Sequence, residues 1–154
     1  MKNTEEALKW IVGILQKHNI PFRISGGFAA RIYGSNRELA DIDIGMQENY
    51  FPQILPEIKD YIVSGPEIYK DDEWNLFAAT LNYKGQDIDL YPISELKFFN
   101  KKEKRWEDLK HTFSNLFFAE VYGLKVPIIS RKNLIEYKNK LNREVDVIDV
   151  KQML

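Results

Sequence analysis

Two pairs of aspartates in this sequence have the spacing that a metal site requires. Asp41 and Asp43 stand one residue apart in the stretch LADIDIG, and Asp87 and Asp89 stand one residue apart in QDIDLYPI. Residues i and i+2 of a β-strand point to the same face, with Cα atoms roughly 6.5 to 7 Å apart, so each pair directs two carboxylates into one small volume. Two such anions repel each other unless a cation lies between them, and a hard divalent ion such as Mg²⁺ prefers oxygen ligands. Each pair is therefore a candidate ligand set for Mg²⁺.

The alternative interpretation of each pair is an exposed strand face that carries aspartates by chance. Aspartate is nevertheless depleted in strands, and this sequence places two such pairs on strands that we expect to be neighbours. If the two strands adjoin, three or four carboxylates converge, and such a convergence favours a bound metal.

A glycine turn lies upstream of the first aspartate pair. Ser25, Gly26 and Gly27 lead from a short apolar strand directly into a helix-sized segment. The N–H groups of such a turn form an anion site suited to phosphate, whereas an ordinary tight turn is the alternative. A phosphate site beside a carboxylate metal site is what phosphoryl or nucleotidyl transfer requires.

Hydrophobic periodicity and turn residues predict the elements that position these residues. The predicted helices are 4–19, 28–33, 49–61 (split or kinked by Pro56), a short one after a polar loop in 97–111, 131–141 capped by Ser130, and 144–154. The predicted strands are 22–25, 39–45, one that begins at Ile62 and ends at Gly65-Pro66, and two hairpins, 74–83 with 86–93 and 116–121 with 125–129. This order predicts an α+β or α/β fold with a mixed sheet.

Composition bounds the function. The chain has 154 residues, 44% of them hydrophobic and 29% charged, which predicts one soluble domain. A formal net charge of -1 gives no global reason to expect nucleic acid or an anionic membrane as the main partner. The absence of cysteine excludes disulfides, thiolate nucleophiles and cysteine-ligated zinc. Neither a secretory signal nor a membrane-spanning run is recognisable, so we expect a cytoplasmic protein.

The sequence resembles the nucleotidyltransferase superfamily of the polymerase-beta type. It is most similar to the small bacterial members, the minimal nucleotidyltransferases and the lincosamide and aminoglycoside nucleotidyltransferases. The resemblance rests on Gly26-Gly27, a helix, Asp41-x-Asp43 followed by an apolar residue, and a later strand aspartate. It extends to the tail VYGLKVPIISRKNLIEYKNKLNREVDVIDVKQML, which resembles the hairpin, lysine-bearing helix and Arg-x-x-Asp-x-x-Asp helix of these proteins.

The resemblance implies a mixed sheet with helices packed on one face, followed by C-terminal helices. The single domain would span 1–154, with a core of about 20–95 and a C-terminal hairpin and helices over 113–154. Asp41, Asp43 and Asp89 would hold Mg²⁺, as two ions, and Asp89 would also position or deprotonate the acceptor hydroxyl. Asp87 directly follows the hairpin turn and is the less suitable third acid, although it stays open.

The resemblance also implies a binding site for the nucleoside triphosphate donor. Its triphosphate would lie on Ser25, Gly26 and Gly27. Arg31, Arg37 and Lys138 could neutralise the leaving pyrophosphate, with a solvated surface charge as the alternative for each. Gly34-Ser35 departs from the serine that these proteins commonly carry soon after the glycines, and its role is open.

The implied reaction is transfer of a nucleoside monophosphate to an acceptor hydroxyl, with release of pyrophosphate. The acceptor could be a small molecule, a protein or RNA; we expect neither DNA nor membrane as a partner, and a homodimer is left open. The alternative is a non-catalytic nucleotide-binding or antitoxin-like regulatory protein that acts through a protein partner.

Three further features have an open role. Lys101, Lys102, Lys104 and Arg105, followed by Trp106, could contact RNA or another polyanion, with an exposed basic loop as the alternative. The aromatic residues that could stack on a base, or belong to the core, are Trp74, Phe77, Tyr83 and Tyr91. Asp146 and Asp149 stand at i and i+3 of a helix, where capping or salt bridging is the expected role.

Overall fold

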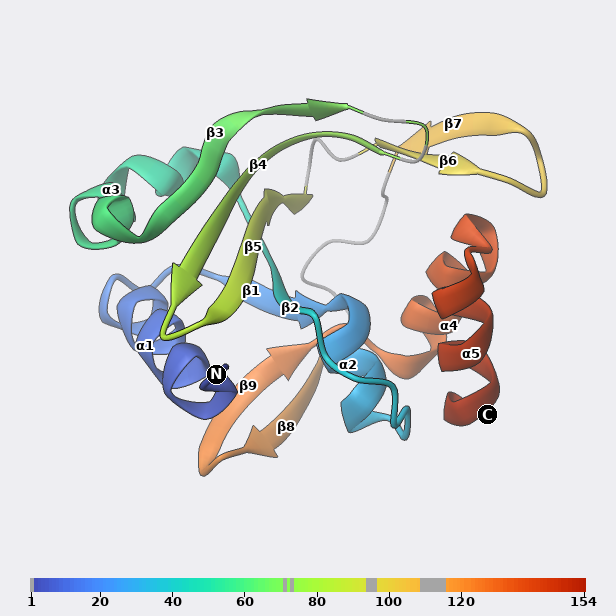
Figure 1. Ribbon diagram of the computed structural model, residues 1–154, viewed down its shortest axis with the longest axis horizontal. Coiled ribbons are helices and arrows are strands. Elements are labelled where there is room, and N and C mark those ends of the chain that lie inside the picture. The colour runs from blue at the N-terminus through green and yellow to red at the C-terminus, as the bar shows by residue number, and fades with distance from the viewer. Residues whose placement is uncertain (1, 71, 73, 94–96, 109–115) are drawn as a thin grey trace.

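A mixed nine-stranded sheet forms the centre of the molecule (Figure 1). The computed structural model describes residues 2–70, 72, 74–93, 97–108 and 116–154. The helices are α1 (Thr4–Lys17), α2 (Gly26–Ile32), α3 (Phe51–Ile58), α4 (Arg131–Leu141) and α5 (Glu144–Met153). The strands are β1 (Phe22–Ser25), β2 (Asp41–Met46), β3 (Ile62–Lys70), β4 (Trp74–Tyr83), β5 (Gln86–Pro92), β6 (Lys97–Asn100), β7 (Arg105–Asp108), β8 (Phe117–Val121) and β9 (Leu124–Ile128). Their order in the sheet is β7-β6-β4-β5-β2-β1-β9-β8, with β3 paired to β4. The fold is therefore α+β, as the sequence predicts.

Strand β2 lies between an antiparallel and a parallel neighbour. It pairs antiparallel with β1 and parallel with β5, in a register that sets Asp43 opposite both Ser25 and Asp89. Because side chains alternate along a strand, the isoleucines at 42, 44 and 88 all turn to the other face, where they are fully buried. The sheet thus has an apolar face and a polar face on the same three strands.

Helices α1 and α3 form the hydrophobic core together with the apolar face of the sheet. Helix α1 is capped by Asn3, whose side chain accepts a hydrogen bond from the N–H of Glu6. The buried residues of α1 belong to one hydrophobic cluster with those of α3 and with the isoleucines of β2 and β5. In α1 these residues are Ala7, Leu8, Ile11, Val12, Ile14 and Leu15. Figure 1 shows α4 and α5 side by side, separated from α1 by the sheet. Among the described residues, no helix is long and apolar enough to cross a membrane.

The structure corrects the predicted end of β3. We expected Gly65-Pro66 to end this strand, but it continues to Lys70 after two shifts of register between Ile62 and Glu67. Proline cannot donate a hydrogen bond to a neighbouring strand, so strands tolerate it at edges and bulges. Among the strands that the structure describes, β3 pairs with β4 alone, and Pro66 falls within the shifted region. The missing N–H of Pro66 therefore does not end the strand.

The structure also corrects the prediction for residues 97–111. Strands β6 and β7 form a hairpin where a loop followed by a short helix was predicted, and residues 109–111 lie outside the described part of the chain. The side chain of Asn100 stabilises the turn, because its Oδ1 accepts hydrogen bonds from the N–H groups of Lys102 and Glu103. Among the hairpin residues whose burial the structure describes, Phe98 and Asn100 alone are buried, so the hydrophobic pattern is too weak to predict a strand.

Helix α3 is shorter than predicted. It spans eight residues and includes Pro56, and 3₁₀ turns at Glu48–Tyr50 and Lys59–Tyr61 flank it. We predicted that Pro56 splits or kinks a helix over 49–61. Proline removes one helical hydrogen bond, and the helix changes to 3₁₀ geometry after Ile58.

Candidate functional site

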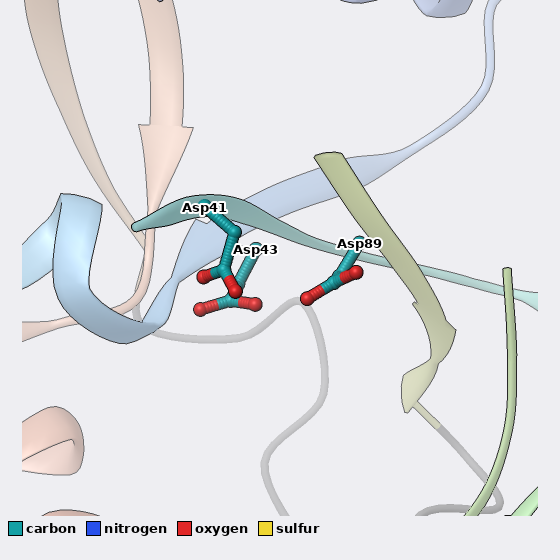
Figure 2. Close-up of side chains that lie close together, drawn as sticks. All are labelled: Asp41, Asp43 and Asp89. Atoms are coloured by element: carbon teal, nitrogen blue, oxygen red, sulfur yellow. The ribbon is translucent and has the colours of Figure 1, made fainter. Parts of the chain in front are cut away.

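Three carboxylates converge on the polar face of the sheet. Figure 2 shows the side chains of Asp41 and Asp43 on β2 and of Asp89 on β5 directed toward one another. One carboxylate oxygen from each lies within 4.8 Å of the others. Parallel pairing of β2 with β5 produces this arrangement, since it sets Asp43 directly opposite Asp89.

Burial and mutual repulsion raise the pKa of these acids. The pKa of Asp43 is well above its ordinary value because the group is buried and because the carboxylates of Asp41 and Asp89 lie close to it. Burial and the carboxylate of Asp41 raise the pKa of Asp89 to about 6, although a hydrogen bond from Thr80 opposes the rise. Thr80 donates this bond to Oδ1 of Asp89 over 2.7 Å. A cation between the three groups would remove the repulsion, and an all-oxygen ligand set fits Mg²⁺.

Asp87 lies outside this cluster. It stands opposite Asp41 in the β2–β5 register, but its side chain is exposed and its Oδ1 accepts a hydrogen bond from Asn82 over 2.9 Å. The geometry therefore brings Asp89 rather than Asp87 together with Asp41 and Asp43.

The glycine turn contacts the carboxylate cluster directly. Helix α2 begins at Gly26, which has a φ of +63°, and a Cβ built on it would lie 1.8 Å from Oδ2 of Asp43. A Cβ on Gly27 would lie 2.9 Å from Nη2 of Arg37. Glycine at both positions lets the backbone of the turn lie against Asp43 and Arg37, where any larger residue would clash. Ser25 lies beside them, and its hydroxyl is hydrogen-bonded to that of Tyr91.

The predicted cations lie in different surroundings. The guanidinium of Arg37 binds Asp149 through Nε at 3.1 Å and Nη2 at 2.9 Å and lines the cavity. Lys138 is 3% exposed and bridges Asp146 at 3.2 Å and Asp149 at 3.0 Å, which excludes its alternative as a solvated charge. Arg31 does not line the cavity; its Nη1 donates to the backbone oxygen of Arg37 at 2.6 Å. Arg31 thus holds the loop through this hydrogen bond, outside the lining of the cavity.

Buried ion pairs connect these cations to α5. Arg143 binds Asp146 through two nitrogens, at 2.6 and 2.9 Å. Burial opposes ionisation of Asp149, but hydrogen bonds from Arg37, Ser35 and Lys138 lower its pKa to about 2. Asp146 and Asp149 therefore act in salt bridges, as predicted, and they hold three cations at one wall of the cavity.

The loop that contains Gly34-Ser35 is attached to the same helix. The hydroxyl of Ser35 donates to Asp149 at 2.7 Å, and the amide of Gln152 exchanges hydrogen bonds with Asn36 at 2.8 and 2.7 Å. This attachment places Arg37 at the cavity, so Ser35, whose role was open, contributes to positioning the loop.

A cavity of about 570 Å³ joins the carboxylates, the glycine turn and the cations. Its lining includes residues that sequence reasoning did not select: Arg23, Thr80, Tyr137 and Arg143. Arg143 could have been selected from the Arg-x-x-Asp-x-x-Asp pattern, whereas no pattern distinguished the others.

Of the aromatic residues considered for base stacking, Tyr91 lines the cavity. Tyr83 stacks on Trp10 at 4.5 Å and belongs to the core. The side chains of Trp74 and Phe77 lie outside the described part of the structure.

Comparison with known proteins identifies the fold. No protein-family model matches the sequence, and no curated protein matches it. A candidate nucleotidyltransferase from Thermotoga maritima has a similar structure, with a TM-score of 0.74 and 18% identity over 98% of this chain and 93% of that chain. The lincosamide antibiotic adenylyltransferase LnuA, bound to lincomycin, has a TM-score of 0.64 and 15% identity over 99% of this chain and 96% of its own.

A further similar structure is ANT(2")-Ia in complex with adenylyl-2"-tobramycin. Its TM-score is 0.63, with 14% identity over 99% of this chain and 88% of that chain. At such low identity the similarity concerns architecture, and it extends over most of both chains in all three cases. The chain described here therefore has a nucleotidyltransferase-like fold.

Proposed function

We propose that this protein is a Mg²⁺-dependent nucleotidyltransferase, which transfers a nucleoside monophosphate from a nucleoside triphosphate to an acceptor hydroxyl. The observation that carries the proposal is the contact between the carboxylate cluster and the glycine turn, where Gly26 lies against Asp43. A metal site and a phosphate site thereby share one cavity, as in-line phosphoryl transfer requires.

The donor would bind along the wall formed by α2, α4 and α5. Backbone N–H groups of Gly26 and Gly27, with the hydroxyl of Ser25, would bind phosphate oxygens. Arg37 and Lys138, both at the cavity wall, would offset the charge that develops on the leaving pyrophosphate. The cations are already held by Asp149, so little reorganisation is needed when the donor binds.

The three aspartates would hold two Mg²⁺ ions. When bound, these ions would polarise the phosphate oxygens and stabilise the attacking and leaving oxygens. Asp89 would accept the proton of the acceptor hydroxyl, since Thr80 donates to its Oδ1 and leaves its second carboxylate oxygen for this role. The acceptor oxygen forms a bond to the α-phosphorus while the bond from that phosphorus to the bridging oxygen breaks. Pyrophosphate leaves with that electron pair.

Transfer from each of the four nucleoside triphosphates, labelled at the α-phosphate, tests the proposal. Cell extract, lincomycin and tobramycin are the candidate acceptors. The last two are chosen because one similar structure contains lincomycin and another contains adenylyl-2"-tobramycin. We expect Mg²⁺-dependent labelling and pyrophosphate release that Asp43→Asn lowers by at least about 100-fold. Asp60→Asn, an exposed carboxylate on the 3₁₀ turn after α3, is the matched control. If the Asp43→Asn variant labels the acceptor as well as the wild type does, the proposal is wrong.

A comparison of Asp89→Asn with Asp87→Asn tests the third acid separately. We expect the larger loss from Asp89→Asn, because Asp89 lies in the cluster. The non-catalytic alternative predicts nucleotide binding without labelling of any acceptor, and the convergence of all three acids favours the enzyme.

A further inference from the structure

The turn between β6 and β7 has a concentrated positive charge. Residues 101–105 read Lys-Lys-Glu-Lys-Arg, and all five are exposed. Among the residues that the structure describes, neither Lys102 nor Lys104 has a carboxylate oxygen within 4.0 Å of its ammonium. These two charges are available to an external anion, although the whole chain has a net charge of only -1.

Asn100 makes the turn rigid. This side chain is 3% exposed, and its Oδ1 accepts hydrogen bonds from the N–H groups of Lys102 at 3.0 Å and Glu103 at 3.1 Å. Its Nδ2 donates to Glu107 at 3.2 Å. These hydrogen bonds hold the backbone of the turn, so that ligand binding has to order mainly the lysine side chains.

The turn is connected to the wall of the cavity through α4. The N–H of Lys101 donates to the backbone oxygen of Lys140 at 3.0 Å, and Phe98 packs edge-on against Tyr137 at 4.8 Å. Tyr137 lines the cavity, as does Arg143 just beyond the end of α4. Arg143, which is paired with Asp146, and Lys140, which is paired with Glu107 and Glu136, thus lead from the cavity toward the turn. Figure 1 shows the β6–β7 hairpin on the same side of the molecule as α4 and α5.

An exposed indole lies at the far side of the hairpin. Trp106 is 42% exposed, and its ring lies 5.6 Å from that of Phe99 at an interplanar angle of 72°. These two residues are paired across the hairpin, so they share the face opposite to Phe98 and α4. Cations that follow a backbone, together with an exposed aromatic ring, are typical of surfaces that bind single-stranded nucleic acid.

We propose that this surface, formed by Arg143, Lys140, the 101–105 turn and Trp106, binds a single-stranded polynucleotide whose terminal hydroxyl is the acceptor in the cavity. The proposal rests on the proposed nucleotidyl transfer and names its acceptor class. The phosphates of the strand follow the cations from the cavity to the turn, and a base several nucleotides from the end stacks on Trp106.

Fluorescence anisotropy with labelled single strands of about 12 nucleotides, RNA and DNA of one sequence, measures this binding directly. We expect the double variant Lys102→Glu/Lys104→Glu to weaken it and to reduce the slope of log affinity against log salt by about 1.4, for two lost phosphate contacts. Lys59→Glu/Lys151→Glu, with the same charge change on exposed helical positions elsewhere, should leave affinity within about twofold. Trp106→Ala should weaken binding by roughly tenfold and Trp106→Phe by less.

The length of the strand provides a second test. The residues of the turn do not line the cavity, so we expect the double variant to weaken binding of the long strand and to leave binding of a dinucleotide unchanged. Equal binding of polyglutamate, or affinity unchanged by both the double variant and Trp106→Ala, would overturn the proposal. Anisotropy measures strand binding without any transfer, so the binding surface and the reaction are tested separately. Transfer to a small acceptor without strand binding refutes this surface alone. Strand binding without transfer to any acceptor, in the presence of Mg²⁺ and nucleotide, refutes the proposed reaction and the role of the strand as its acceptor, and leaves only the binding surface.

Discussion

Gly26 and Asp43 are so close that no side chain fits between them, since a Cβ on Gly26 would lie 1.8 Å from Oδ2 of Asp43. This contact joins the glycine turn of α2 to the carboxylate cluster of β2 and β5. A change at either residue should therefore affect both halves of the site.

Gly26→Ala should abolish metal binding and destabilise the fold by more than about 1 kcal/mol, because it adds a clash with Asp43 to the strain of a φ of +63°. Gly123→Ala is the matched control, since Gly123 has a φ of +79° with nothing within 4 Å of its added Cβ. Urea unfolding and titration with Mn²⁺ as a spectroscopic substitute for Mg²⁺ measure the two effects. Equal loss of metal affinity in both variants would contradict the assigned contact.

Asp43→Asn should raise the thermal midpoint of the metal-free protein at pH 8. The pKa of Asp43 is well above its ordinary value because of burial and the neighbouring carboxylates, so its charge destabilises the folded state at high pH. The same variant should lose the rise in midpoint that Mg²⁺ produces in the wild type. Calorimetry with and without Mg²⁺ checks both effects, and an unchanged response to Mg²⁺ would exclude Asp43 as a ligand.

Stabilisation by Mg²⁺ should be larger at pH 8 than at pH 5. Burial and the carboxylate of Asp41 raise the pKa of Asp89 to about 6, so the metal-free fold loses stability as the pH rises through that value. Mg²⁺ binds the ionised acids, and each tenfold excess of free ion over its dissociation constant adds about 1.4 kcal/mol. Thermal midpoints over a Mg²⁺ series at the two pH values measure the difference. Equal shifts would mean that the ion binds elsewhere.

Asp149→Asn should destabilise the protein by about 2 to 3 kcal/mol at pH 7, because it leaves the buried Lys138 with one carboxylate, that of Asp146, in place of two and removes a group whose pKa is lowered from about 4 to about 2. Hydrogen bonds from Arg37, Ser35 and Lys138 hold the pKa of Asp149 at about 2, against burial. The stability that it contributes is therefore present above the ordinary carboxyl pKa of about 4 and is lost as the pH falls toward 2. Urea unfolding from pH 7 to pH 2 should show the two proteins converge. A constant difference would assign the effect to packing.

Gln152→Ala should weaken nucleotide binding and leave metal binding unchanged. Its amide holds Asn36 by two hydrogen bonds, and this loop carries Arg37 to the glycine turn. The loss should be about 1 kcal/mol in stability and several-fold in affinity for a non-hydrolysable nucleotide. Lys151→Ala, the exposed neighbour on α5, is the control. Isothermal titration separates the outcomes, and an equal loss of Mn²⁺ affinity would show a general disturbance of the site.

Comparison of the predicted and observed elements shows where local patterns suffice. The alternation of aspartate and isoleucine predicts the faces of β2 and β5, and Ser130 caps α4, where its side chain accepts from the N–H of Asn133. These features depend on neighbours along the chain. The β6–β7 hairpin was missed because contacts with α4, through Phe98 and Lys101, stabilise strands that have little hydrophobic pattern of their own.

The sequence by itself determined which residue types could form the site, because strand alternation directs four aspartates to one face and glycine permits a close backbone approach. Only the tertiary structure decided which of them meet. The β2–β5 register brings Asp89, and not Asp87, into the cluster with Asp41 and Asp43. Packing against α5 buries Lys138 and directs Arg37 to the cavity. Arg31 instead donates a hydrogen bond to the backbone oxygen of Arg37. Such choices depend on distances between elements far apart in the chain, which no local pattern encodes.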